Sequence, residues 1–280
     1  MNIIAESSTT RTEWALVEGS KIVEHAFTKG LNPFFQTRRE ISHTIRLELP
    51  EAFFRRRWNH VYYYGAGCAN QEQNQIMDSS LVAQFQTPVT VESDLLGAAR
   101  GLLVRNAGLA CILGTGSNSC LYNGEEITKT VSPLGFVLGD EGSGAYMGKR
   151  LVADILKGIA PDDIIQAFYE KFAVTPNVLM DDVYTNPMPS RTLSHYSTFL
   201  AEHLDNAYVY HLVYSAFMHF FARNIAAYDY KRQPICFVGS TCVLFSDVLR
   251  RAAADFGVEI AKICRYSMPG LVEYHANDEK

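Results

Sequence analysis

The order of the predicted elements indicates an α/β protein built from two similar halves. Each half opens with three short strand patterns, and helices then alternate with further strands. In each half, the turn between the first two strands is rich in glycine or hydroxyl side chains. An antiparallel meander followed by alternating helices and strands is typical of a mixed sheet covered by helices. Duplication of such a domain predicts two domains with a cleft between them.

Local signals support each element of the first half. Gly19-Ser20 is a good hairpin turn. Ile41, Ile45 and Leu49 are spaced four apart, as on one face of a helix. Ser93-Asp94 can cap the helix that follows. The predicted elements are strands at Asn2–Ala5, Glu13–Glu18, Lys21–Phe27, His60–Tyr64 and Pro88–Val91, and helices at Thr37–Leu49, Asn70–Gln84 and Leu95–Arg105.

The second half repeats this order with a helix-rich region, about residues 145–228, inserted into it. Tyr210, Val213, Phe217, Phe220 and Phe221 recur at helical spacing, and we expect them to lie in the core. The predicted elements are strands at 109–113, 117–122, 126–131, Pro234–Gly239 and Glu259–Ile263, helices at Ala145–Leu156, His195–Asp205, Tyr208–Tyr228 and Val243–Phe256, and a loop at Thr185–Ser190.

Two glycine-rich turns in the stretch Ala110–Gly144 indicate a phosphate-handling site. Gly114–Ser117 joins two strand patterns, and Gly139–Gly144 leads into the helix at Ala145–Leu156. Glycines let the backbone approach a ligand closely, and the free N–H groups at a helix N-terminus favour an anion.

Composition excludes several classes of protein. The 280 residues carry a net charge of −5, whereas a general nucleic-acid binder needs a basic face. No apolar run reaches the length of a membrane span, and the first residues lack a signal-peptide pattern, so we expect a cytoplasmic protein without membrane contact. The six cysteines form no CxxC pair and are expected to be buried, reduced thiols.

Seven stretches together resemble a known family. They are AESSTTRTEWAL (5–16), GLNP (30–33), YYGAGC (63–68), ESDLLGAARGL (92–102), ILGTGSNSCL (112–121), PLGFVLGDEGSGAYMGKRL (133–151) and FVGSTCVLFSDVL (237–249). In this order they resemble the N-acetylglucosamine kinase and BadF-type ATPase family, a branch of the actin-like sugar kinase and Hsp70 ATPase superfamily. The resemblance spans nearly the whole chain.

The resemblance implies two ribonuclease-H-like domains with ATP and a sugar in the cleft between them. The first domain would cover residues 1–106, with a C-terminal helix at about 267–280 packing back on it. The second would cover residues 107–266 and include the helical insertion. The implied reaction is transfer of a phosphoryl group from Mg²⁺-ATP to an amino sugar such as N-acetylglucosamine.

The resemblance also implies a role for individual residues. Asp94 matches the general base, and Asn32 and Asp140 match side chains that bind sugar hydroxyls. The turn residues Gly114, Thr115, Gly116 and Ser117 would meet the phosphates, with Thr115 and Gly116 also near the sugar. Gly239 and Ser240 would lie against adenosine. The first phosphate loop would hold Glu6, Ser8, Thr9, Thr10 and Arg11, with Glu6 binding the metal through a water molecule.

The residues by themselves leave alternatives open. Asp94 could simply cap its helix. Asp140 and Asn32 could be turn formers. Glu141 could orient its neighbours or cap the following helix. The oligomeric state, including a homodimer, also stays open.

The first loop, Glu6–Thr12, departs from the family pattern DGGGTKT or DSGSTKT. Glu6 replaces aspartate, and Arg11 replaces lysine. Ser7, Ser8 and Thr9 stand in place of glycines or serine and add β-carbons where glycine would let the backbone approach phosphate. Altered nucleotide binding at this loop leads to two alternatives to a kinase. One is a catalytically degenerate member that binds a sugar or nucleotide as a sensor or partner. The other is a BadF-type ATPase activator, which would need cysteine ligands for an iron–sulfur cluster.

Overall fold

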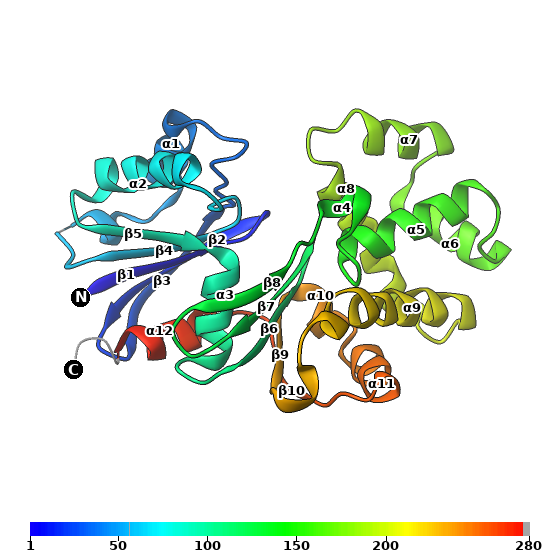
Figure 1. The fold of residues 1–280 in the computed structure, drawn as a ribbon. Coiled ribbons are helices and arrows are strands. Elements are labelled where there is room, and N and C mark those ends of the chain that lie inside the picture. The colour runs from blue at the N-terminus through cyan, green and yellow to red at the C-terminus, as the bar shows by residue number, and fades with distance from the viewer. Residues whose placement is uncertain (56, 277–280) are drawn as a thin grey trace. The chain divides into compact units, whose positions relative to one another are not determined.

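The computed structural model describes residues 1–55 and 57–276, which form two compact units (Figure 1). Unit 1 comprises Met1–Ala110, Tyr122–Thr128 and the chain from Tyr266 on, and unit 2 comprises Cys111–Leu121 and Lys129–Arg265. The domain limits expected from the sequence, 1–106 and 107–266, remain our proposal. Of the C-terminal helix expected at about 267–280, residues 277–280 lie outside the described residues.

The first sheet has five strands in the order β3-β2-β1-β4-β5. The first three strands pair antiparallel, whereas β1 pairs with β4, and β4 with β5, in parallel. This is the mixed sheet that the sequence predicts. The elements of this part of the chain are β1 (Asn2–Ser7), β2 (Arg11–Glu18), β3 (Lys21–Lys29), α1 (Arg38–Glu48), β4 (Val61–Gly65), α2 (Gln71–Phe85), β5 (Val89–Ser93), α3 (Asp94–Leu103) and α12 (Met268–Ala276).

Alternation of side chains along the strands builds a core on each face of this sheet. On one face, Ile3 and Trp14 pack with the apolar sides of α1 and α2. On the other face, Ile4 and Tyr64 pack with Met268, Leu271 and Val272 of α12 (Figure 1). The C-terminal helix is therefore part of the core of unit 1.

The second sheet repeats the topology of the first, in the order β8-β7-β6-β9-β10. Counted along the chain, both sheets have the order third, second, first, fourth, fifth, which confirms the predicted pair of similar halves. Its strands are β6 (Gly108–Leu113), β7 (Ser117–Tyr122), β8 (Ile127–Val131), β9 (Ile235–Val238) and β10 (Ile260–Cys264).

The helices that follow β8 differ in part from the prediction. They are α4 (Gly135–Leu138), α5 (Gly144–Leu156), α6 (Asp162–Phe172), α7 (Pro176–Tyr184), α8 (Pro189–Ser197), α9 (Ala207–Arg223), α10 (Ser240–Leu244) and α11 (Ser246–Phe256).

Several of the predicted boundaries in this region are wrong. The helix expected at Tyr208–Tyr228 ends at Arg223. Pro189 was expected in a loop, but it begins α8. Proline suits the first helical position, because the N–H that it lacks would have no hydrogen-bond partner within the helix. The helix expected at His195–Asp205 is the end of α8 followed by a 3₁₀ turn at Thr198–Glu202. The helix expected at Val243–Phe256 is two helices that meet at the buried Phe245.

Aromatic packing holds α9 in unit 2. Phe220 and Phe221 lie about 6 Å, ring centre to ring centre, from Phe237 of β9. The predicted core face of this helix is confirmed for Val213, Phe217, Phe220 and Phe221, which are fully buried. It is wrong for Tyr210, which is 38% exposed and stacks on Tyr214 instead.

Candidate active site

The carboxyl ends of three parallel strands come together in unit 1. Ser7 of β1 is in register with Gly65 of β4, and Gly65 is in register with Ser93 of β5. Ligand sites in α/β sheets form beyond the carboxyl ends of the strands. This end of the sheet is therefore where a site is expected, and the residues that follow each strand are its candidates.

Asp94 is the first residue of α3, directly after β5. The side chain that caps this helix is that of Ser93, whose hydroxyl accepts a hydrogen bond from Leu96 N at 3.2 Å. Burial raises the pKa of Asp94, and hydrogen bonds from the backbone N–H groups of Leu95 and of Asp94 itself oppose that rise. Ser93 is therefore the residue whose side chain caps α3. The carboxylate of Asp94 lies beside this cap and is half-buried.

Asn32 is held in a turn beside the end of β4. Its Oδ1 accepts a hydrogen bond from Phe34 N at 2.9 Å, and its N–H donates to Gln36 Oε1 at 2.7 Å. Gly67, with φ +83°, approaches so closely that a β-carbon on it would lie 2.0 Å from Asn32 Oδ1. Glycine at position 67 is therefore required for this packing. This role of Gly67 was not predicted from the sequence, although Gly67 lies in the matching stretch YYGAGC.

Ser7 ties the first loop to its neighbours, a role that the sequence did not suggest. Its buried hydroxyl lies 2.7 Å from Thr12 Oγ1 and donates to Leu31 O at 3.0 Å. Leu31 N donates back to Ser7 Oγ at 3.0 Å. Gly30 allows the same close approach, since a β-carbon on it would lie 2.6 Å from Ser8 O.

The tip of the first loop is closed by hydrogen bonds within the loop. Ser8 N donates to Arg11 O at 2.9 Å. The hydroxyl of Ser8 accepts long hydrogen bonds from Thr10 N (3.4 Å) and Arg11 N (3.3 Å). Two backbone N–H groups of this loop therefore point at Ser8 in this conformation.

Glu6 lies among acidic groups at the end of β1. In register, it stands opposite Glu13 of β2. Its Oε1 accepts a hydrogen bond from the hydroxyl of Ser267. Burial raises the pKa of Glu6 to about 7, the hydrogen bond from Ser267 opposes this rise, and the charges of Glu13 and Asp94 add to it.

In unit 2, the turn Gly114–Ser117 lies against the start of α5. Gly144 N donates to Gly114 O at 2.9 Å, and Ala145 N donates to Thr115 O at 3.0 Å. The next N–H group, that of Tyr146, donates to Ser143 Oγ at 3.1 Å. The prediction that this helix offers free N–H groups to an anion is therefore wrong, because the neighbouring turn and the capping serine occupy them.

Asp140 closes against the same turn. Its Oδ1 accepts a hydrogen bond from Ser117 N at 3.2 Å, and a β-carbon on Gly116 would lie 3.1 Å from its Oδ2. Burial raises the pKa of Asp140 to about 6, while the hydrogen bond from Ser117 N lowers it. Asp140 also has φ +56°, in the left-handed region that aspartate tolerates better than most residues. The adjacent Glu141 is buried, and its Oε1 lies 3.4 Å from Arg223 Nη1.

Gly239 and Thr241, on either side of Ser240, also meet this turn. A β-carbon on Gly239, which has φ +131°, would lie 2.3 Å from Leu113 O. Thr241 Oγ1 donates to Gly114 O at 2.9 Å. The structure therefore brings Gly114–Ser117, Asp140 and Gly239–Ser240 together within unit 2.

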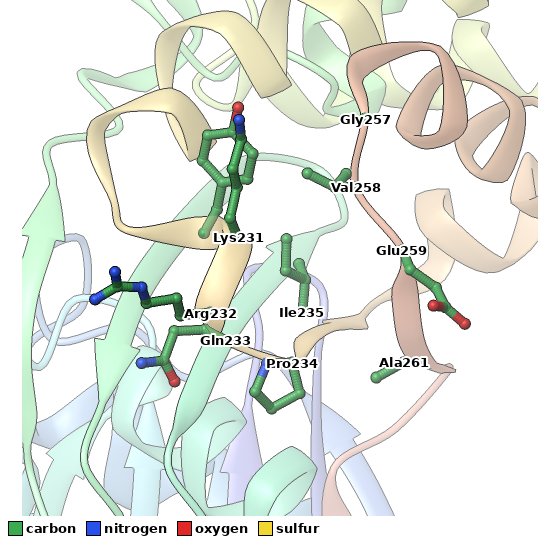
Figure 2. A pocket seen from close by; sticks show the side chains of 10 residues that line it. Lys231, Arg232, Gln233, Pro234, Ile235, Gly257, Val258, Glu259 and Ala261 are labelled. Carbon is green, nitrogen blue, oxygen red and sulfur yellow. The ribbon is translucent and has the colours of Figure 1, made fainter.

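A surface pocket of about 530 Å³ lies elsewhere in unit 2 (Figure 2). Its lining includes Lys231, Gln233, Ile235 and Glu259. Ile235 begins β9, whereas Gly239 follows the last residue of that strand. The pocket therefore lies at the opposite end of β9 from the turn residues and is not the candidate site.

Residues 1–55 and 57–276 hold no group of three or more His, Cys, Asp or Glu side chains arranged to bind a metal ion. Five of the six cysteines are buried, and Cys264 is half-buried. Over the same residues, no helix is both long and apolar enough to cross a membrane.

Comparison with known proteins identifies the family. A solved structure of a Porphyromonas gingivalis protein, described as a candidate N-acetylglucosamine kinase, superimposes with a TM-score of 0.96. The two sequences are 37% identical over the full length of both chains. The chain belongs to the N-acetylglucosamine kinase family.

More distant structures share the fold of this N-acetylglucosamine kinase family member. A candidate N-acetylglucosamine kinase from Chromobacterium violaceum has a TM-score of 0.70 at 15% identity over 98% of both chains. A ROK family glucokinase from Streptomyces griseus, solved with glucose and AMPPNP, has a TM-score of 0.58 at 14% identity over 99% of this chain and 98% of that one. No protein-family model and no curated protein matches the sequence.

Proposed function

We propose that this chain is an ATP-dependent sugar kinase whose acceptor is an amino sugar, with N-acetylglucosamine as the expected substrate. The observation that carries the proposal is the 37% identity, over the full length of both chains, to the Porphyromonas gingivalis candidate N-acetylglucosamine kinase. Glucose and AMPPNP in the related Streptomyces griseus glucokinase are consistent with a sugar and a nucleotide as the two ligands of this fold.

Asp94 would act as the general base. Phosphoryl transfer needs an acceptor hydroxyl aligned with the γ-phosphorus and a group that takes its proton. A half-buried carboxylate with a raised pKa suits this step, because it accepts a proton more readily than an exposed one. Ser93 supports the assignment, since it caps α3 and leaves Asp94 available.

Asn32 and Asp140 would hold the sugar hydroxyls. The turn Gly114–Ser117, with Thr115 and Gly116 also near the sugar, would meet the phosphates. Gly239 and Ser240 would lie against adenosine. Gly116 packs closely on Asp140, and Gly239 packs closely on Leu113. This packing supports the proposal that the residues for the sugar and those for the nucleotide lie around the same turn.

The first loop fits a metal-binding role poorly. Mg²⁺ would neutralise the phosphates of ATP when bound. The only first-loop residue expected to contact it, through a water molecule, is Glu6, and the hydroxyl of Ser267 already occupies its Oε1. We therefore assign no step of the reaction to a metal ion bound by Glu6.

A panel of amino sugars, each mixed with ATP and the purified protein and followed by phosphorus NMR, tests the proposal. We expect one sugar to gain a phosphoryl group, and Asp94→Asn to lower its turnover by roughly 10²–10⁴-fold while sugar binding is kept. Asp247→Asn is the matched control, since Asp247 is exposed in the first turn of α11. Full turnover by Asp94→Asn would refute the base assignment.

The closed first loop favours a second candidate, a degenerate family member that binds its sugar without phosphorylating it. Thr10 N and Arg11 N point at Ser8 and not outward. This candidate is supported if calorimetry detects a bound amino sugar while no sugar in the panel is phosphorylated. The activator alternative requires an iron–sulfur cluster, so iron analysis of anaerobically purified protein tests it directly.

A further inference from the structure

Both charged side chains of the first loop contact the C-terminal segment, Tyr266–Ala276. Glu6 accepts a hydrogen bond from Ser267, which is 1% exposed. The guanidinium carbon of Arg11 lies 4.9 Å from the centre of the Tyr266 ring and 4.2 Å from that of Phe27. A cation between two aromatic rings is held by its attraction to both faces. The chain re-enters unit 1 at Tyr266, so these contacts fall at the start of its last segment.

This segment is a rigid partner, because its helix is built into the core of unit 1. A β-carbon on Gly101 would lie 2.3 Å from Ser267 Cβ, and one on Gly270 would lie 1.8 Å from Gly101 O. The α3 and α12 backbones therefore touch directly. Met268, Leu271 and Val272 are buried against the sheet. Glu6 and Arg11 thus contact a fixed surface.

The length of the Glu6 side chain matches this contact. Glu6 is in register with Tyr64 of β4, whose ring packs on α12, so the two side chains share a face of the sheet. An aspartate at position 6 would be shorter by one carbon–carbon bond, about 1.5 Å. Its carboxylate would stop short of Ser267. The contact therefore gives a physical reason for glutamate where the family pattern has aspartate.

We propose that the C-terminal segment positions the first loop through Ser267 and Tyr266, and that Glu6 and Arg11 serve this contact and not a metal or phosphate. Contact with a nucleotide at this loop is then left to the hydroxyls of Thr9 and Thr10, since that of Ser8 closes the loop. The proposal goes beyond the proposed kinase activity, since these contacts form whether or not the chain transfers phosphate.

Hydrogen exchange measured by mass spectrometry on the intact protein tests the contact. Ser267→Ala and Glu6→Asp should each raise exchange of peptides covering residues 6–12 by roughly tenfold, the equivalent of 1.4 kcal/mol. Peptides covering α12 should exchange as in the parent protein, which shows that the helix stays docked. Glu273→Ala, on the exposed side of α12, is the matched control and should change neither region.

Combining Ser267→Ala with Glu6→Ala should raise exchange no more than either change alone, because both remove the same hydrogen bond. Calorimetry with ATP, with and without Mg²⁺, gives a second readout that needs no turnover. The enhancement of ATP binding by Mg²⁺ should be the same within about twofold in Glu6→Gln and the parent protein.

Two results would overturn the proposal. One is unchanged loop exchange in both Ser267→Ala and Glu6→Asp. The other is a tenfold or greater loss of the Mg²⁺ enhancement in Glu6→Gln, which would return Glu6 to the metal site. Absence of kinase activity would contradict the proposed function but neither of these readouts.

Discussion

Gly67 and Asn32 are packed so closely that any side chain at position 67 would displace the Asn32 amide. The gap between a β-carbon at 67 and Asn32 Oδ1 would be 2.0 Å, well inside van der Waals contact. Asn32 is also fixed by Phe34 N and Gln36 Oε1. The side-chain amide is therefore confined by Phe34 N and Gly67, and the Asn32 backbone is fixed by Gln36, as a sugar-binding group requires.

Gly67→Ala should weaken sugar binding by about tenfold through this displacement. Stability should fall by about 1–2 kcal/mol, because alanine is also disfavoured at φ +83°. Calorimetric titration with N-acetylglucosamine and thermal unfolding measure the two effects. Gly19→Ala is the matched control, since Gly19 has φ +56° but nothing lies within 4 Å of a β-carbon there. Equal sugar affinity in the two variants would remove Asn32 from the proposed site.

Asp140→Asn should stabilise the protein while weakening sugar binding. The pKa of Asp140 in the folded protein is about 6, above its ordinary value of 3.8. Between about pH 4 and 6 the folded protein therefore keeps Asp140 protonated, whereas the unfolded chain loses this proton. Stability due to this group therefore falls as the pH rises from about 4 to 6 and stays low above that. Asparagine keeps the acceptor for Ser117 N without the buried charge.

We expect a gain of about 1–2 kcal/mol at pH 8 in Asp140→Asn and almost none at pH 4, measured by urea unfolding. The gain is smaller than the full pKa shift would give, because residual solvent screens the carboxylate. Asp181→Asn, an exposed change in the same unit, is the control. A pH-independent difference between Asp140→Asn and the parent protein would contradict the assigned cause.

The sequence predicted those parts of the fold that depend on neighbours along the chain. The helix start at Thr37 is an example: Thr37 and Glu40 form a reciprocal capping box. The Gly19-Ser20 hairpin turn and the Ser93 cap are equally local. The similarity of the two halves was also predictable, because each repeats the same pattern of elements along the chain.

Contacts between distant residues could not be predicted in this way. Ser267 is 261 positions away from Glu6, and nothing in either local sequence indicates their hydrogen bond. The N-terminus of α5 was misjudged for the same reason, since the carbonyls that occupy it belong to Gly114 and Thr115. Pro189 carried a usable signal for a helix start, but the nearby Pro187 and Asn186 favoured a loop. The roles of the site residues stay predictions.

Ser7→Ala should lower the free energy of unfolding by about 1–3 kcal/mol, measured in urea. The change removes the hydroxyl that Leu31 N, Leu31 O and Thr12 Oγ1 contact, and it leaves buried polar groups unsatisfied. Ser20→Ala, in the exposed hairpin turn, is the control and should stay within about 0.5 kcal/mol of the parent protein. Equal stability of the two variants would show that Ser7 does not tie the first loop to Leu31.

His275 should make unit 1 sensitive to acid. Its Nε2 lies 2.8 Å from the Tyr64 hydroxyl. That hydroxyl accepts a hydrogen bond from Arg100 Nη1 at 3.0 Å and therefore donates its own proton to His275. Burial, together with the positive charges of Arg100, His60 and Arg105, lowers the pKa of His275 to about 3. Its ordinary value is 6.5, so below that pH the unfolded chain binds the extra proton and stability falls as the pH drops.

Between pH 6.5 and 5, this effect should cost the parent protein about 1–2 kcal/mol, measured by urea unfolding monitored through the fluorescence of Trp14 and Trp58 in unit 1. His275→Gln should show a flatter dependence, because glutamine accepts from Tyr64 without taking up a proton. At pH 7.5 the same variant should be slightly less stable, since it loses the ring that stacks 3.8 Å from the Tyr62 ring centre. His43→Gln, on the exposed side of α1, should follow the parent curve. Parallel curves for the parent protein and His275→Gln would show that another group controls the acid response.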